Sequence, residues 1–168
     1  MQRHLELLAA YHRWTFDVLY EALLALDDVR YRADLGLFFR SIHGTLNHLL
    51  VADKVWFGRV TDTPFVVSGL DAELETDRTE LEQALYSDSA RWQAWIATQS
   101  STQLAANIQY ANMAGTRFEQ ECATLLLHVF NHASHHRGQI SAAISACGLA
   151  VPEMDLIWYL RRVPLVLS

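Results

Sequence analysis

The feature that most restricts the fold of this chain is its scarcity of residues that interrupt helices. Its 168 residues include only 3 prolines and 7 glycines, the two residue types that disfavour helix interiors most strongly. In the first long uninterrupted stretch, residues 2–26, apolar side chains recur at intervals near 3.6 residues, the period of an amphipathic helix. We therefore expect an all-α protein.

Capping residues and helix breakers indicate where further helices begin and end. Ser41 caps a second helix or lies just inside it, and Thr76 or Asp77 can cap a third. Gly148 is placed where a helix would end, because glycine is common just after the last helical residue. Residues 27–38 are expected to be a connection without a helix. The predicted helices cover residues 2–26, 41–60, 77–98, 119–146 and, after Pro152, 153–162.

The stretch before the fourth helix breaks the helical period. Residues 103–110 alternate between apolar and polar, residues 112–115 supply turn formers, and residues 116–118 can return as a short strand. This pattern predicts a small β-hairpin. The expected architecture is one domain, residues 1–168, folded as a four-helix bundle with that hairpin before the fourth helix and a short C-terminal helix.

The composition is that of an ordinary globular protein, with 51% hydrophobic and 19% charged residues and a formal net charge of −6. It contains no basic block, which argues against a nucleic-acid partner. It also lacks a signal-peptide core and any apolar run near the roughly 20 residues of a membrane helix. We expect a cytoplasmic protein with no membrane partner. Cys122 and Cys147 should lie at opposite ends of the fourth helix, too far apart for a disulfide.

The clearest functional signal is a pair of histidines one helical turn apart. His132 and His136 share one face of the fourth helix, within its apolar stripe. A helical projection also places His48 on the buried side of the second helix. Three neutral imidazoles suit zinc, nickel, copper or iron and leave a coordination position open. His48, His132 and His136 are therefore the candidate ligands of a divalent transition metal.

The other histidines fit this role less well. His43 shares a helical arc with charged residues and is expected to face solvent, while His4 and His12 have no partner at ligand spacing. His128 and His135 lie at the edges of the arc that carries the histidine pair, where either would complete the ligand sphere, support a ligand or lie at the surface. The alternative to a metal site is a cluster of hydrogen-bonded core histidines.

Several blocks of sequence resemble the DinB/YfiT-like family. The block from Asn131 to Ile140, preceded by His128, is similar to the family signature. The segments 47–56, 11–14 and 155–161 resemble its upstream, first-helix and C-terminal motifs, so the resemblance spans the chain.

The resemblance implies His48, His132 and His136 as metal ligands in a four-helix bundle that commonly forms homodimers. It departs from the family at His12 and Phe16, positions that the family often fills with asparagine. Family members include S-transferases that use low-molecular-weight thiols, an isomerase-like branch, hydrolases and uncharacterised stress-associated proteins.

The residues around the histidine pair favour thiol activation over hydrolysis. Hydrolysis usually needs a general base, but Ala133 stands where a zinc protease has its glutamate. Asp53 is expected either to support a ligand or to pair with Arg137. A metal-bound thiolate needs no separate base. The predicted function is therefore metal-dependent attack of a low-molecular-weight thiol on an electrophilic small-molecule substrate.

Two other functions are compatible with the same residues, namely a metal-dependent hydrolase and a non-enzymatic stress protein that binds a metal or ligand. Arg59 and Arg137 are the cations available to hold a phosphate or carboxylate. No particular residue is identified as catalytic.

Overall fold

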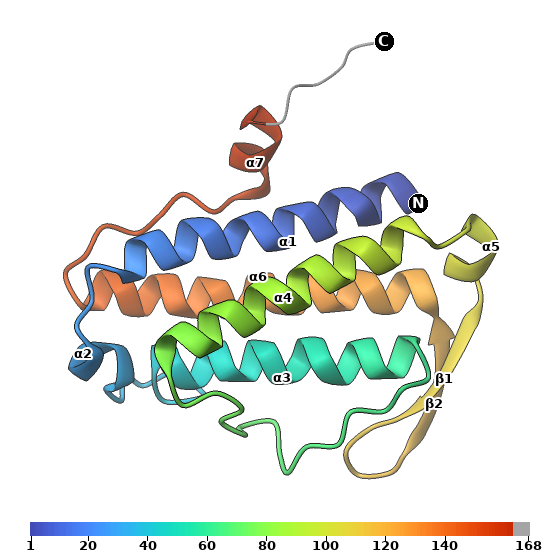
Figure 1. Ribbon diagram of the computed structural model, residues 1–168, viewed down its shortest axis with the longest axis horizontal. Helices are drawn as coiled ribbons and strands as arrows, with labels where there is room; N and C mark the ends of the chain where they lie inside the picture. The colour runs from blue at the N-terminus through green and yellow to red at the C-terminus, as the bar shows by residue number, and fades with distance from the viewer. Residues whose placement is uncertain (163–168) are drawn as a thin grey trace.

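Four long helices lie side by side in the computed structural model, which describes residues 1–162 (Figure 1). Helix α1 packs on α4 and α6, and α3 packs on the same two helices, so α1 and α3 occupy opposite corners of a bundle. This confirms the predicted fold class. Residues 163–168 of the expected domain lie outside the described residues. The long helices are α1 (Gln2–Leu23), α3 (Ile42–Val60), α4 (Arg78–Ala97) and α6 (Cys122–Ala146).

Several boundaries follow from the expected caps. The Ser41 side chain accepts a hydrogen bond from the backbone N–H of Gly44 at 2.9 Å, and Asp77 caps α4 in the same way. These side chains satisfy N–H groups that have no partner within the helix. After α6, Gly148 adopts a φ of +77°, a left-handed conformation that glycine enters easily.

The connection after α1 differs from the prediction. Helix α1 ends at Leu23, three residues early, and the expected irregular connection contains the short helix α2 (Asp28–Arg32). Asp27 caps α2 by accepting the backbone N–H of Arg30. Tyr31 anchors the helix because its side chain is fully buried. The prediction missed α2 because one turn of helix is too short to show a period.

The predicted hairpin is present, but its strands begin and end at other residues than expected. It consists of β1 (Asn107–Ala111) and β2 (Arg117–Glu121), antiparallel with Tyr110 opposite Phe118, and is preceded by α5 (Ser101–Leu104). The fourth long helix starts at residue 122 rather than 119. The Glu119 carboxylate accepts hydrogen bonds from Asn107 and Gln109 across the ladder, which supports these residues as strand.

The C-terminal helix α7 (Leu156–Arg162) begins three residues later than expected. The preceding residues 151–155 form no regular secondary structure, and the Met154 carbonyl accepts a hydrogen bond from the Tyr11 hydroxyl at 2.6 Å. Tyr159 of α7 packs near Trp14 and Tyr11 on α1.

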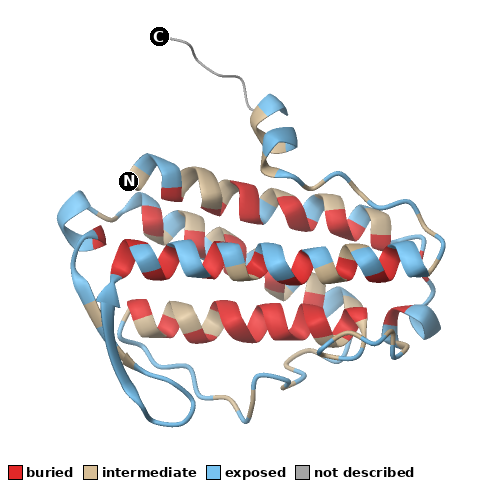
Figure 2. Cartoon of the chain, turned by 180° about the vertical axis from the view of Figure 1, so that it is seen from behind, coloured by how far each residue is buried: buried red, intermediate tan, exposed pale blue. Residues whose placement is uncertain are grey.

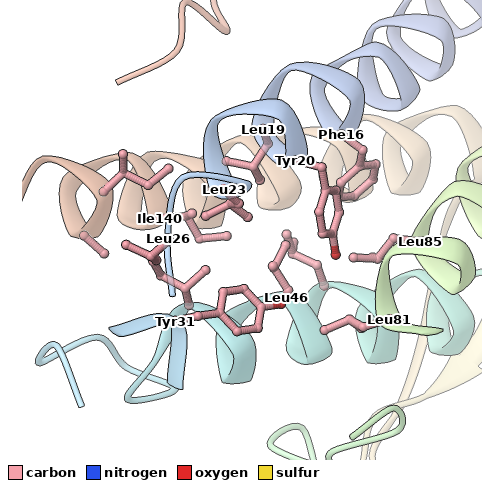
Figure 3. Close-up of a cluster of buried hydrophobic side chains, with 14 of the residues drawn as sticks. Phe16, Leu19, Tyr20, Leu23, Leu26, Tyr31, Leu46, Leu81, Leu85 and Ile140 are labelled. Atoms are coloured by element: carbon pink, nitrogen blue, oxygen red, sulfur yellow. The ribbon is translucent and has the colours of Figure 1, made fainter. Parts of the chain in front are cut away.

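The inward faces of the long helices carry most of the buried residues (Figure 2). Their apolar side chains form two clusters. One includes Phe16, Leu46 and Leu85 (Figure 3), and the other includes Trp92 and Leu126. Polar residues occupy the middle of the bundle between the clusters. They include His12, Asp53, Asp88 and Arg137, all buried.

No helix within residues 1–162 is long and apolar enough to span a bilayer. Both cysteines are free thiols, as expected from their positions near the two ends of α6.

Candidate metal centre

Three imidazoles from two helices meet at one point. His48 projects from α3, and His132 and His136 project from α6. The Nε2 atom of His132 lies 3.3 Å from that of His48 and 3.1 Å from that of His136. His48 and His136 are buried and His132 is half-buried. The structure thus brings together the three histidines selected from the sequence.

Hydrogen bonds fix the orientation of two of these rings. Nδ1–H of His48 donates to the Leu70 carbonyl, and Nδ1–H of His136 donates to the Gln139 side-chain oxygen, each at 2.8 Å. A neutral imidazole carries a single N–H, so the Nε2 lone pairs of both rings face the centre. One proton on His132 can bond to only one of them. Such outer partners commonly orient metal-binding histidines.

The environment keeps the three imidazoles neutral. Burial is the main cause that lowers the pKa of His48 to about 4. The hydrogen bond to the Leu70 carbonyl raises this pKa, and the neighbouring His136 lowers it. Burial, followed by the adjacent His136 and His48, also lowers the pKa of His132 to about 4. Burial lowers the pKa of His136 as well. Near pH 7 the lone pairs are available to a cation.

The donor set fits a transition metal. Two nitrogens that each lie about 2.1 Å from a tetrahedral ion are roughly 3.4 Å apart, close to the observed 3.1 and 3.3 Å. Within residues 1–162, no cysteine or carboxylate joins this group, whose potential ligand atoms all lie within 4.8 Å of one another. Three protein ligands would leave a coordination position open.

Phe39 covers one side of the centre, a role that sequence reasoning missed. Its ring stacks on His48 with the centroids 3.8 Å apart and the planes at 15°, and it lies 5.6 Å from the His136 ring. The next residue, Arg40, has a φ of +68°, unusual for a residue other than glycine. The turn before α3 therefore places an aromatic ring against the imidazoles.

A cleft of about 460 Å³ reaches two of the three imidazoles from the hairpin side. His128 lines it but lies outside the ligand group, with its ring centroid 5.7 Å from that of His132. Trp56 packs edge-on against His128 at 5.0 Å. The lining residues are His48, Ala52, Val55, Trp56, Arg59, Leu70, Asn112, Met113, Ala114, His128 and His132.

Asp53 forms a hydrogen bond with His12, and not with Arg137 or with one of the three candidate ligands as the two expectations had it. Its carboxylate accepts a hydrogen bond from Nε2–H of His12 at 3.0 Å, and an Arg137 N–H donates to Nδ1 of the same ring at 3.1 Å. A neutral imidazole thus separates the aspartate from the arginine. The sequence could not give His12 this role, because its partners lie 41 and 125 residues away.

The expectation that His43 faces solvent was also wrong. Its side chain is only 4% exposed, and its Nε2 lies 2.9 Å from a carboxylate oxygen of Glu73. Asn47 also holds the loop between α3 and α4, because its side-chain oxygen accepts hydrogen bonds from the backbone N–H groups of Leu74 and Glu75. A projection of α3 alone could not reveal this loop. His135 is exposed.

A family model described as the DinB family matches residues 1–163. The chain belongs to the DinB family. One similar member of the family is named "Protein DinB" in Bacillus subtilis (strain 168). It is 26% identical over 156 residues, which cover 89% of this chain and 90% of the relative.

The fold of this DinB-family chain is also found in a solved structure, a crystal structure of a DinB-like protein from Bacillus cereus ATCC 10987. The two share a TM-score of 0.62 at 19% sequence identity. The match covers 83% of this chain and 91% of the other. At this identity the likeness concerns the fold alone.

Proposed function

We propose that His48, His132 and His136 hold a divalent transition metal, such as zinc, nickel or iron, and that the protein joins a low-molecular-weight thiol to an electrophilic small molecule. The convergence of three Nε2 atoms, two of them fixed as unprotonated, carries the proposal. Without a cation, these lone pairs would face one another with too few protons to bond them all.

The metal, when bound, would lower the pKa of a coordinated thiol and favour its thiolate form. The chain itself would supply neutral imidazoles as ligands and exclude water on one side through Phe39. In this proposal the thiol proton would pass to an imidazole nitrogen of His128, which lines the same cleft as His132.

Thiol transfer is favoured over hydrolysis because the nearby carboxylate is already engaged. Asp53 accepts from His12 on the buried side of α3 and is 2% exposed, so it is not placed to activate water. In the proposed reaction, the sulfur loses its proton and its lone pair forms a C–S bond. The bond to the leaving group breaks, and that group departs with the bonding electrons.

The first test is metal content measured by elemental mass spectrometry on protein purified without an affinity tag. We expect about one divalent ion per chain in the wild type, its loss in His132→Ala and its retention in His4→Ala. The control removes an exposed histidine from α1. Absence of metal from the wild type, even after anaerobic reconstitution, would refute the metal site.

The second test separates thiol transfer from its alternatives. The metal-loaded wild type is supplied with glutathione, mycothiol or bacillithiol and a panel of electrophiles, and thioether formation is followed by mass spectrometry. We expect transfer that His132→Ala reduces at least a hundredfold and His4→Ala leaves unchanged. Hydrolysis of the electrophiles without thiol incorporation would support a hydrolase. Bound metal with neither reaction would support a binding protein.

The proposal also includes a single domain over residues 1–168, expected from the chain length, and a cytoplasmic location, expected from the absence of a signal-peptide core and of a long apolar run in the sequence. It further includes a homodimer, as the resemblance of the motifs to the family implies. Light scattering coupled to size-exclusion chromatography tests the dimer. A monomer would show a molar mass of 19.1 kDa, the mass of one chain, and would refute the dimer.

A further inference from the structure

Arg59 occupies an unusual position in the cleft beside the candidate metal centre. Its guanidinium lies beside two aromatic rings that pack edge-on against each other, 4.4 Å from the Trp56 centroid and 5.2 Å from the Tyr110 centroid. The side chain is partly buried. Contact with the two rings orients the guanidinium, while its N–H donors lie in the plane of the group and remain able to bind a ligand.

Within residues 1–162, this cation has no carboxylate as partner. Among residues 1–162, the ion pairs of the structure do not include Arg59, and its guanidinium makes no hydrogen bond to another residue of that part of the chain. Asp62 lines an adjoining hollow with Arg59 but forms no ion pair with it. By contrast, Arg91 also stacks on an aromatic ring, at 4.0 Å from Phe57, yet it pairs with Asp88.

The remaining groups around Arg59 suit an organic anion. The titratable groups around it are Tyr110 on the hairpin, His128 on α6 and, in the adjoining hollow, Asp62. Apolar contact area comes from Val55, Trp56 and Met113, which line the same cleft. One planar guanidinium matches the two oxygens of a carboxylate. A cleft of about 460 Å³ has the size of a small-molecule site.

The position of Arg59 also sets a length for the ligand. It follows His48 on α3 by eleven residues, which brings it back to nearly the same helix face, about 16 Å along the axis. Its side chain leans toward the start of the helix and over Trp56, so the charged head lies closer to the histidines than its backbone does. A ligand contacting both sites must be elongated.

We infer that Arg59 binds the carboxylate of a small elongated organic acid whose other end reaches the three-histidine centre. This assigns the thiol or its electrophilic partner to the carboxylic acids, and in that respect it rests on the proposed function. Arg59 is then a specificity-determining residue that acts on substrate affinity.

The first experiment titrates the full-length metal-loaded protein with hexanoate and with the neutral hexanamide, using calorimetry. We expect hexanoate to bind the wild type at least tenfold more tightly than hexanamide. Arg59→Gln should remove that preference, Arg59→Lys should retain part of it, and Arg91→Gln should leave it unchanged. Equal binding of the two ligands, no binding of either, or a preference that survives in Arg59→Gln would overturn the inference.

A second experiment links the carboxylate to the centre. Mercaptoalkanoates of increasing length, with the thiol and the carboxylate at opposite ends, are compared with the matching mercaptoalcohols. We expect an optimum length in the wild type and none in Arg59→Gln. If the hexanoate preference depends on Arg59 but the thiol adds no affinity, the carboxylate site stands and thiol activation fails. If thiols bind equally well to Arg59→Gln, thiol binding stands and the carboxylate site fails.

Discussion

The imidazole of His12 connects two buried charges without adding one of its own. It donates to Asp53 through one nitrogen and accepts from Arg137 through the other, and Arg137 also donates to the Ser134 hydroxyl at 2.9 Å. Buried charges are costly unless they are paired and hydrogen-bonded. The neutral ring lets an aspartate on α3 balance an arginine on α6, although α1 supplies the bridge.

Asp53→Asn should therefore be strongly destabilising. It keeps the shape of the side chain but leaves Arg137 without a compensating charge, a change that typically costs about 3–5 kcal/mol. Urea denaturation would measure it. The matched control is Asp28→Asn, which removes one of the two carboxylate partners of Arg32 at the surface and should cost less than about 1 kcal/mol. Equal effects of the two substitutions would contradict this account.

At the scale of elements, α3 is the helix on which the site depends most. It supplies His48, the cleft residues Trp56 and Arg59, and one charge of the buried network. The segment that carries Phe39 packs against the first turn of α3. Gly44 is required there, because a Cβ at this position would overlap the backbone carbonyl of Phe39.

Two glycine substitutions test this close approach. Gly44→Ala should destabilise the protein by about 1–3 kcal/mol, as expected for overpacking against backbone, and should displace Phe39 from His48. Gly138→Ala is the control, since Gly138 lies within α6 and a Cβ there meets nothing within 4 Å. It should stabilise the protein by about 0.5–1 kcal/mol. Chemical denaturation would give both values, and a neutral Gly44→Ala would show that the turn can move.

At the scale of the whole molecule, a polar layer crosses the bundle between its two apolar clusters. All four long helices contribute to it, through His12 on α1, Asp53 on α3, Asp88 on α4 and Arg137 on α6. Asp88 pairs with Lys54 at 3.3 Å. Even so, burial raises the pKa of Asp88 above its ordinary value, and the nearby Asp53 adds to the increase, against the effects of Lys54 and Arg91.

This shift predicts how stability changes with pH. The pKa of Asp88 is higher in the folded protein than its unfolded value, near 4. At any pH between these two values, the folded protein therefore holds more protons on this group than the unfolded chain does. Stability from this group is therefore lost over that window. Asp88→Asn removes the effect, so its free energy of unfolding relative to the wild type should increase between pH 4 and 7.

Urea denaturation of both proteins across that pH range provides the measurement. Glu80→Gln, at an exposed acid on the same helix, should show a much smaller change with pH. A difference between Asp88→Asn and the wild type that stays constant from pH 4 to 7 would refute the prediction.

The sequence by itself determined the four long helices, the hairpin and the selection of His48, His132 and His136. These depend on local information. Few helix breakers, an apolar stripe and a histidine pair at four-residue spacing all act within a single helix. The ends of β2 and α7 were misplaced because cross-strand bonds of Glu119 and a contact between Tyr11 and Met154 decide them.

Only the tertiary structure decided what surrounds the three histidines. Phe39, the Leu70 carbonyl and the His12 bridge come from segments that no helical projection of α3 or α6 contains. His43 was misplaced for the same reason, since a loop covers it. Side-chain periodicity reports which face of a helix is buried, whereas the partners on that face depend on how distant segments pack together.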